Sequence, residues 1–313
     1  MNQQFDIVVA GDFNIDLLFN GFPHIPAVGE EVIASDFQMV LGSSAAITAT
    51  HLAALGAKVA FVGAMGADEM GEKLLTFLKS ANVCTDFVKV KKGMQTGCTV
   101  VMNQADDRAN LTYAGAMETL CKDDFPYATI AKTPYFHLSN PFVLPELRNS
   151  LTSLFRNIKA LGAKTSLVPQ WDVTGKWDLD FVNLLPHLDY FFPNREELMR
   201  FTKKDNIEVA LSEMSSVLKH QLMMTNGREG ALLRTPEKQM NQSGYVNNNP
   251  VDCVGAGDAF AAGYLVAKME GKSDEKALEM ACESGALSTF CYGGSPFCEN
   301  RNDFNEKVFK LLK

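Results

Sequence analysis

The sequence has no long hydrophobic run and no excess of positive charge. Of its 313 residues 46% are hydrophobic, yet the apolar stretches are short, as in residues 7–10, whereas a membrane-spanning helix needs about 20 apolar residues. The first six residues are polar and do not resemble a secretory signal. The 29 Lys and Arg residues against 37 Asp and Glu give a formal net charge of −8. We therefore expect no membrane partner and no nucleic-acid partner.

Several common site motifs are also absent. The seven cysteines form no CxxC pair and no Cys/His cluster with zinc spacing, so reduced thiols in a cytoplasmic protein are expected. No GxxxxGK[ST] phosphate loop occurs, which argues against the common NTPase class. A dinucleotide fold is disfavoured too, because Gly255 and Gly257 are followed by Phe260 where a third glycine or alanine belongs.

Short β-branched runs alternate with helical segments along most of the chain. This strand, helix, strand order is typical of a parallel sheet and predicts an α/β fold. Residues 12–16, which begin and end with aspartate, follow the first expected strand at its carboxyl end. Strands are expected at residues 5–11, 59–63, 133–138, 165–168, 189–192 and 221–225, and helices at residues 44–55, 70–80, 145–161, 196–202, 207–219, 257–269 and 274–292.

Two segments interrupt this alternation. Residues 31–40 alternate polar and apolar side chains, and residues 87–113 are rich in Thr, Val and Lys without a helical period. We expect these two segments to pair with each other in a small sheet. Because the chain has no internal repeat and no flexible linker, residues 1–313 are predicted to form a single α/β domain, with a β-sheet lid from about residues 14–41 and 87–117.

The segment with the clearest chemistry begins at Asp252 and reads Asp-Cys-Val-Gly-Ala-Gly-Asp-Ala-Phe. Gly255, Ala256 and Gly257 lead into an apolar helix, so their amides can point from its positive end and bind phosphate. Asp258 lies in the first turn, where the helix dipole is expected to keep it ionised. A carboxylate beside an anion hole suits deprotonation of an alcohol that attacks a phosphoryl group. A glycine-rich turn with an acidic cap has the same spacing.

The segment from Asp252 resembles the DTxGAGDxF signature of the ribokinase-like (PfkB) carbohydrate kinases. Other segments resemble motifs of that family in the same order. These are residues 6–13 with Asn14 and Asp16 (the first strand and its sugar-binding aspartate), residues 42–56 (GGxxxNxAxxxxxLG), Gly66, Asp68 and Gly71 (GxDxxG), residues 194–197 (NxxE) and residues 225–231 (TxGxxGa).

The resemblance implies a three-layer sandwich with a mainly parallel central sheet and a small β-sheet lid. It also implies transfer of the γ-phosphoryl group of ATP, with magnesium, to a hydroxyl of a small sugar or sugar-like alcohol. Asp258 would be the general base, and the amides of Gly255, Ala256 and Gly257 would be the anion hole. A homodimer formed through the lid is common in this family.

Binding residues follow from the same resemblance. The acceptor would contact Asn14, Asp16, Gly42, Ser43 and Arg108. The nucleotide would contact Asn194, Glu197, Thr225, Gly227, Gly230 and Ser288. Glu197 would act on magnesium through water, and the backbone around Asp252, Val254 and Gly293 is a candidate site for potassium.

Some of these residues also have purely structural interpretations. Asn194 and Glu197 have the spacing of a capping box, and the small residues near Ser288 could serve tight helix packing. Arg108 is either solvated or a contact to acceptor or phosphate. Tyr113, Phe37 and Met39 either cover the acceptor or form the face on which two lids meet.

Four positions depart from the family pattern. Ser43 stands at the second of the paired glycines, Ile47 at the usual asparagine, Val168 at a frequent aspartate and Cys253 at the threonine of the signature. Gln170 or Asp172 could take over the role of that aspartate, and Ser43 or Ser44 could cap the helix that follows.

The departures leave the acceptor open among sugars, sugar acids and nucleosides, with a plain sugar as first choice. A nucleoside would want an aromatic platform, for which Phe13, Phe22 and Tyr113 are candidates. The alternatives to a sugar kinase are a nucleoside kinase of the same family and a non-catalytic sugar- or nucleotide-binding protein on this fold.

Overall fold

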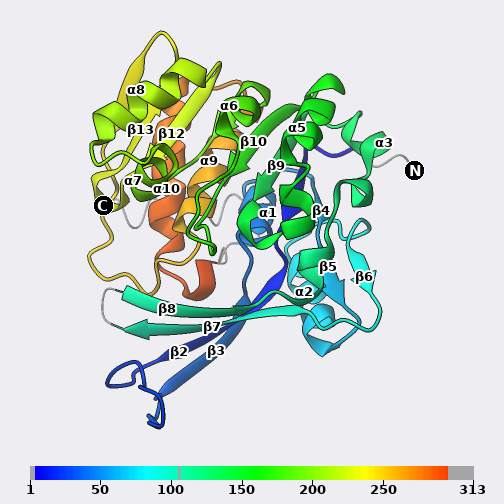
Figure 1. The fold of residues 1–313 in the computed structure, drawn as a ribbon, viewed down its shortest axis with the longest axis vertical. Helices are drawn as coiled ribbons and strands as arrows, with labels where there is room; N and C mark the ends of the chain where they lie inside the picture. The colour runs from blue at the N-terminus through cyan, green and yellow to red at the C-terminus, as the bar shows by residue number, and fades with distance from the viewer. Residues whose placement is uncertain (1–3, 105–106, 295–313) are drawn as a thin grey trace.

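An eight-stranded sheet forms the centre of the molecule. The computed structural model describes residues 4–104 and 107–294. The strand order is β14-β13-β12-β11-β10-β9-β1-β4, and every pair from β4 to β12 is parallel. Figure 1 labels β13, β12, β10, β9 and β4 in this order across the sheet. The strands are β1 (Ile7–Gly11), β4 (Val59–Val62), β9 (Tyr135–Ser139), β10 (Lys164–Val168), β11 (Tyr190–Phe191), β12 (Gln221–Thr225), β13 (Ala231–Arg234) and β14 (Gln239–Gln242). The predicted mainly parallel sheet is confirmed.

Helices cover both faces of this sheet, because its strands are apolar on both sides. In β1, Ile7 and Val9 belong to one buried cluster, whereas Val8 and Ala10 belong to the other. The first cluster includes side chains of α1 (Ser44–Ala54), α2 (Glu69–Ser80), α9 (Ala256–Met269) and α10 (Asp274–Ser288). The second includes α3 (Tyr127–Ile130), α4 (Pro145–Arg148), α5 (Leu151–Ala160), α6 (Phe181–Leu184), α7 (Arg195–Thr202) and α8 (Ile207–Val217). The expected three-layer sandwich is therefore present.

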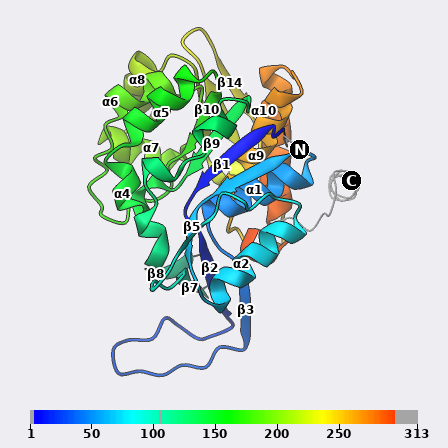
Figure 2. The same cartoon turned by 90° about the vertical axis from the view of Figure 1, so that its right-hand side faces the viewer.

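A separate four-stranded sheet forms the lid and lies beside one end of the central sheet (Figure 1). Its order is β3 (Asp36–Leu41), β2 (Asn14–Asn20), β7 (Gly97–Gln104) and β8 (Asp107–Tyr113). The prediction that the two lid segments pair directly is wrong, because β2 lies between β3 and β7. The connection from β2 to β3 extends away from the rest of the molecule (Figure 2).

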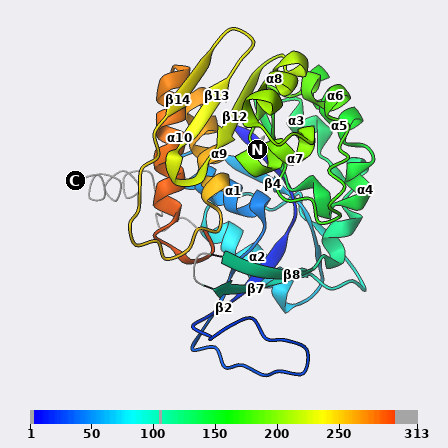
Figure 3. The ribbon, with the colours of Figure 1, turned by 60° about the vertical axis from the view of Figure 1, so that its left-hand side comes forward.

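Four further differences from the expected elements are present. The helix expected at residues 145–161 is split into α4 and α5, and α10 ends at Ser288, before the expected end at residue 292. The hairpin of β13 and β14 was not predicted and lies beside α10 (Figure 3). Residues Lys89–Lys91 (β6) pair with β5 (Ala64–Gly66), not with the lid. Short 3-10 helices occupy Gly115–Thr119, Lys122–Asp124, Pro141–Val143, Leu185–His187, Gly227–Glu229 and Tyr292–Gly294.

The parallel arrangement brings the chain segments after β1, β9, β10, β11 and β12 to one edge of the sheet, where open α/β sheets bind ligands. The amino-terminal ends of α1 and α9 contribute residues to a pocket at that edge, as do β2, β7 and β8 of the lid. In the described part of the chain, no helix is long and apolar enough to cross a bilayer.

Candidate active site

A cavity of about 1240 Å³ lies at the carboxyl edge of the central sheet, under the lid. Pockets for one small ligand usually measure about 300 to 1,000 Å³, so this cavity has room for two molecules. The predicted site residues that line it are Asn14, Asp16, Ser43, Arg108, Asn194, Glu197, Thr225, Gly227, Gly230, Val254, Gly255, Ala256, Gly257 and Asp258. Gly42, Asp252, Gly293 and Ser288 lie outside the lining.

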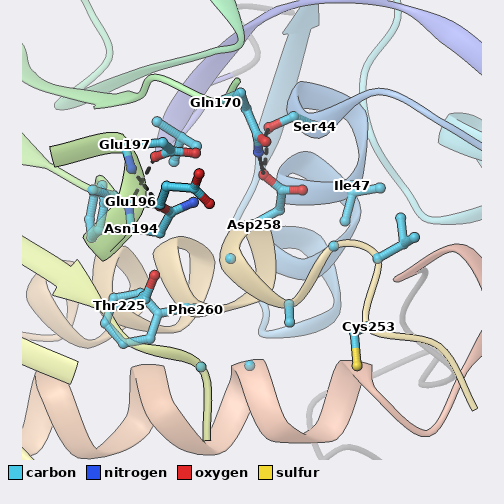
Figure 4. A pocket seen from close by; sticks show the side chains of 18 of the residues that line it. Ser44, Ile47, Gln170, Asn194, Glu196, Glu197, Thr225, Cys253, Asp258 and Phe260 are labelled. Carbon is cyan, nitrogen blue, oxygen red and sulfur yellow. Dashed lines mark hydrogen bonds between the residues drawn. The ribbon is translucent and has the colours of Figure 1, made fainter. Parts of the chain in front are cut away.

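Asp258 lies in the first turn of α9 and is only 4% exposed. Its Oδ1 accepts a hydrogen bond from Ser44 Oγ at 2.5 Å and one from Gln170 Nε2 at 3.1 Å (Figure 4). Burial raises the pKa of Asp258 to about 8, and the nearby charges of Asp12 and Glu197 raise it as well. Desolvation thus acts against the helix dipole, which was expected to keep this carboxyl ionised. A pKa near neutrality suits a general base.

The amide groups of the predicted anion hole begin α9. Gly255 is its N-cap with φ +77°, and the first amides of a helix have no intrahelical partner. A Cβ at Gly255 would lie 2.9 Å from the Cα of Gly294, whereas a Cβ at Gly257 would have nothing within 4 Å. Gly255 is therefore required by the backbone, and Gly257 leaves open space over the amides.

Asp12 follows β1 and is a site residue that the sequence analysis did not single out. Its carboxylate accepts hydrogen bonds from the backbone amides of Ser44 (3.2 Å) and Ala45 (3.0 Å) and from Asn140 Nδ2 (2.9 Å). Burial raises its pKa despite these donors. An acidic residue directly after a buried strand was the available signal. Asp12 thus joins the ends of β1 and β9 to the start of α1 in the cavity wall.

Asn14 and Asp16 lie together on β2. Asn14 Nδ2 donates to Asp16 Oδ1 at 2.8 Å and to Thr99 Oγ1 of β7 at 3.1 Å. Burial raises the pKa of Asp16 to about 7; Asp12 raises it further, whereas Arg108 lowers it. A Cβ on Gly42 would come within 2.2 Å of Asp16 Oδ1. Gly42 thus makes room for the side chains of Asn14 and Asp16 without itself lining the cavity.

Two neighbouring serines at the start of α1 have different roles. Ser43 is the N-cap: its Oγ accepts from the amide of Ala46 at 2.9 Å and donates to the carbonyl of Asp12 at 2.5 Å. Its φ of +71° is in the range that favours glycine, which explains why the family has a glycine there. Ser44 points instead to Asp258 (Figure 4).

The loop after β10 decides between the two candidates for the missing aspartate. Gln170 lines the cavity and contacts Asp258. Asp172 is fully buried and accepts hydrogen bonds from the amides of Thr174 (2.8 Å) and Trp177 (2.6 Å). Asp172 therefore fixes the loop, and Gln170 is the polar residue of the site. Ile47 and Val168, two of the other departures, contribute apolar surface to the lining, and Cys253, the last one, also lines the cavity.

Residues 194–197 show both features predicted for them, a capping box and a place in the cavity lining. Asn194 and Glu197 form a complete capping box at the start of α7, with bonds of 2.8 and 2.9 Å, and both also line the cavity (Figure 4). Burial raises the pKa of Glu197 to about 7. Thr225 forms an isolated bridge with Asn194, which places the two at neighbouring strand ends.

The other predicted nucleotide residues differ in their surroundings. Gly227 has φ +53° and open space at its Cβ position, whereas a Cβ on Gly230 would lie 2.0 Å from the carbonyl of Gln242. Gly230 is thus demanded by the hairpin of β13 and β14. Ser288 Oγ donates to the carbonyl of Gly285 at 2.9 Å, a contact within α10. The lining also includes basic residues that sequence reasoning missed: Arg195, Arg200, Lys203, Lys204 and Arg228.

The three residues of the candidate potassium site form one structural unit. Asp252 Oδ1 accepts from the amide of Val254, and its Oδ2 accepts from the amide of Gly293, each at 2.9 Å. This carboxylate ties the loop before α9 to the turn after α10. Across residues 4–104 and 107–294, no group of three or more His, Cys, Asp or Glu side chains could hold a metal ion.

The two faces of the lid sheet differ sharply. Cross-strand neighbours on the face toward the cavity are Asn14, Asp16, Thr99, Val101, Arg108, Asn110 and Thr112. The alternate positions carry Leu17, Phe19, Phe37, Met39, Val100, Met102, Leu111 and Tyr113. Phe37, Met39 and Tyr113 therefore face away from the cavity, and the interpretation that they cover the acceptor is wrong.

Comparisons with known proteins agree with this geometry. Residues 4–301 match the pfkB family carbohydrate kinases. The chain is 26% identical over 302 residues to ribokinase of Bacillus subtilis, covering 96% of this chain and 98% of that protein. It is 29% identical over 327 residues to ribokinase of Arabidopsis thaliana, covering 98% of this chain and 81% of that protein. The chain belongs to the PfkB family of carbohydrate kinases.

Solved structures give the same fold. A structure of Arabidopsis thaliana ribokinase complexed with ribose and ATP superimposes with a TM-score of 0.82 and 28% identity, covering 99% of both chains. Adenosine kinase from Sinorhizobium meliloti has a TM-score of 0.85 at 20% identity over 97% of this chain and 99% of its own, which shows the fold. The family match and the named relatives define the enzyme class as ATP-dependent carbohydrate kinase.

Proposed function

We propose that this protein transfers the γ-phosphoryl group of ATP to a hydroxyl of a small, uncharged sugar or sugar-like alcohol, with Asp258 as general base. One observation carries the proposal. The buried carboxyl of Asp258 lies beside the first amides of α9, in a cavity that reaches both the Asn14–Asp16 pair and Thr225. This is the arrangement in which an alcohol and a phosphate chain can meet.

In the proposed reaction, the acceptor hydroxyl gives its proton to the Asp258 carboxylate and its oxygen attacks the γ-phosphorus. The bond to the β,γ-bridging oxygen breaks, and ADP leaves with that electron pair. The amides of Gly255, Ala256 and Gly257 stabilise the charge on the transferred group. Each such donor is worth about 3 kcal/mol in comparable anion holes.

Magnesium fits the residues present. Mg²⁺ takes few protein ligands and keeps several waters beside the substrate phosphates, and Glu197 supplies a buried carboxylate on the nucleotide side of the cavity. When bound, magnesium would neutralise phosphate charge, and Glu197 would hold it through water. ATP with Mg²⁺ is named in a structure of a putative ribokinase II from E. coli.

Backbone carbonyls around Asp252, Val254 and Gly293 remain our candidates for potassium.

The lining favours a sugar over a nucleoside as acceptor. Its aromatic residues are Phe192, Tyr245 and Phe260, which come from the segments after β11 and β14 and from α9, not from the lid or α1. Phe13 packs on Phe61 in the core, with ring centroids 4.8 Å apart. The acceptor side thus offers hydroxyl-binding groups rather than a stacking platform for a base.

The charges on the acceptor side favour an uncharged acceptor over a sugar acid. Asp12, Asp16 and Asp258 all line this part of the cavity, and Arg108 is the basic residue on the lid that faces them. A carboxylate on the acceptor would meet like charges. Similar proteins include ribokinases and probable fructokinases but also an ATP-dependent ribose-1-phosphate kinase, so the preference for an uncharged acceptor rests on the charges of the lining.

The test of the proposed base is Asp258→Asn. This change should lower ADP formation by several orders of magnitude, while calorimetry shows ATP affinity within about threefold of wild type. The alternative, a non-catalytic binding protein, gains if wild type forms no ADP with any acceptor while still binding ATP. Full activity in the Asn variant would exclude Asp258 as base.

We also propose a homodimer joined through the outer face of the lid. Leu111 is 70% exposed and Phe37 and Tyr113 are each 51% exposed, an apolar patch of the kind that marks protein contacts. Light scattering should give twice the chain mass for wild type and the single mass for Leu111→Asp.

We also propose that the protein works in a reducing compartment, the cytoplasm. The support is the set of free thiols, which are those of Cys84, Cys98, Cys121, Cys253, Cys282 and Cys291.

A further inference from the structure

Gln170 occupies a backbone conformation that the fold must enforce. It follows Val168 and Pro169 at the end of β10 and has φ +61°, in the left-handed region that is unfavourable for a residue with a side chain. The buried carboxylate of Asp172 holds the next turn by accepting from the amide of Trp177. Such conformations persist when the surroundings impose them, and they cluster at functional sites.

The side chain of Gln170 completes a closed set of three hydrogen bonds. Its Nε2 donates to Ser44 Oγ at 2.9 Å and to Asp258 Oδ1 at 3.1 Å, and Ser44 Oγ donates to the same Oδ1 at 2.5 Å (Figure 4). The three residues come from the loop after β10, from α1 and from α9. Because a carboxylate only accepts, the amide nitrogen of Gln170 must face it, and the one hydroxyl hydrogen of Ser44 then points to Asp258.

These three hydrogen bonds give the two carboxylate oxygens of Asp258 different surroundings. Oδ1 takes both donors, whereas none of the residues in 4–104 and 107–294 donates a hydrogen bond to Oδ2. We propose that Ser44 and Gln170 are positioning residues that hold Asp258 by Oδ1, so that Oδ2 receives the proton of the acceptor hydroxyl. This inference rests on the proposed function and adds which oxygen reacts and what orients it.

The two donors also set the charge state of Asp258. The charged groups that face it are Asp12, after β1, and Glu197, on α7, and both raise its pKa together with burial. The hydrogen bonds from Ser44 and Gln170 lower the pKa. Removal of either donor should therefore raise the pKa of Asp258, so that the variant reaches the same rate only at a higher pH.

The experiment is the pH profile of kcat for wild type, Ser44→Ala, Gln170→Ala and Ser44→Thr. The acidic limb should move upward by about one pH unit in each Ala variant, which lowers kcat about tenfold below the limb and much less above it. Ser44→Thr keeps a hydroxyl and should keep the limb close to its wild-type position. A loss of kcat that is equal at every pH would overturn the proposal.

Two matched variants control for general damage. Thr50→Ala removes a buried hydroxyl of the same helix that donates to the carbonyl of Ile47, and Gln242→Ala removes a half-buried glutamine side chain on β14. Neither side chain contacts Asp258, so both variants should keep the acidic limb where wild type has it. A limb that moves equally in these controls would also contradict the inference.

A readout without turnover separates this inference from the proposed function. The carboxyl ¹³C signal of Asp258, assigned by its absence in Asp258→Asn, is titrated in wild type and in both Ala variants. Its midpoint should rise by about one pH unit in each variant. If no acceptor is turned over but the midpoints rise, the contacts stand and the kinase function fails. If kinase activity is present but the midpoints do not move, the positioning role fails.

Discussion

The hydroxyl of Ser44 and the carboxylate of Asp258 meet at 2.5 Å, although 214 residues separate them in the chain. Ser44 begins α1 and Asp258 lies in the first turn of α9, so the contact joins the amino-terminal ends of two helices that pack on the same face of the sheet. The position of the proposed base is thus determined by the packing of the whole layer.

Burial of Asp258 should make wild type less stable as the pH rises. Its pKa is raised to about 8 in the folded protein from an ordinary value of 3.8, so the folded state keeps a proton that the unfolded state releases. The stability that this proton contributes is present below pH 3.8 and is lost as the pH rises toward about 8. Asp258→Asn should match wild type near pH 4 and exceed it in free energy of unfolding by about 5 kcal/mol at pH 8.

Urea unfolding of both proteins at several pH values checks this prediction. Asp16 and Glu197, whose pKa values burial raises to about 7, are present in both proteins and cancel in the comparison. A stability difference that does not change between pH 4 and pH 8 would show that Asp258 is ionised in the folded protein throughout that range.

Two glycines of the anion hole should respond oppositely to alanine. At Gly257 a Cβ has nothing within 4 Å and φ is not positive, so Gly257→Ala should keep full stability while its methyl group obstructs the amides and lowers kcat/KM about 100-fold. At Gly255, φ +77° and the contact with Gly294 should cost about 2 kcal/mol. Melting curves and initial rates separate the two, and normal activity in Gly257→Ala would contradict the anion hole.

Replacement of Ser43, at the start of α1, by glycine should destabilise the protein less than its replacement by alanine. Ser43 has φ +71° and caps the helix. Gly relieves the strained backbone and is an acceptable N-cap, whereas Ala keeps the strain and loses the cap. Ser43→Gly should exceed Ser43→Ala by about 1 to 2 kcal/mol in free energy of unfolding. Equal stability of the two variants would mean that the backbone at this position carries no strain.

Arg108 should affect the acceptor and not the nucleotide. It lies on β8, lines the cavity from the lid, and lowers the pKa of Asp16. Arg108→Ala should raise KM for the acceptor about tenfold and leave KM for ATP unchanged. Steady-state kinetics with each substrate varied in turn gives the answer. A rise in KM for ATP instead would place Arg108 at the phosphates.

Much of the fold could be predicted because periodicity and turn residues report local structure. The parallel strands of the central sheet and helices such as α1 and α9 begin and end within a few residues of their expected bounds. These strands are β1, β4, β9, β10, β11 and β12. The lid was predicted to begin at about residue 14, where β2 begins, but the place of β2 between β3 and β7 was not predicted, because strand order depends on contacts between distant segments. Polar β14 lacked the apolar pattern that indicates a strand.

The site was predictable where a motif specifies the backbone, as at Gly255 and Asp258. Contacts between distant segments were not. Gln170 and Asp172 are both polar residues of one loop, and only the fold shows that Gln170 points into the cavity and Asp172 into the core. The raised pKa of Asp258 likewise depends on burial by α1, β1 and the loop after β10, which no local pattern reports.

The most direct test of the central claim is ADP release by wild type, with ATP and magnesium, across neutral pentoses and hexoses, sugar acids and nucleosides. The structure predicts that at least one neutral sugar is phosphorylated with the highest kcat/KM, and that Asp258→Asn abolishes this activity. Preference for a nucleoside or a sugar acid would contradict the proposed acceptor class. Absence of ADP release with every acceptor would contradict the assignment of this cavity as a sugar-kinase active site.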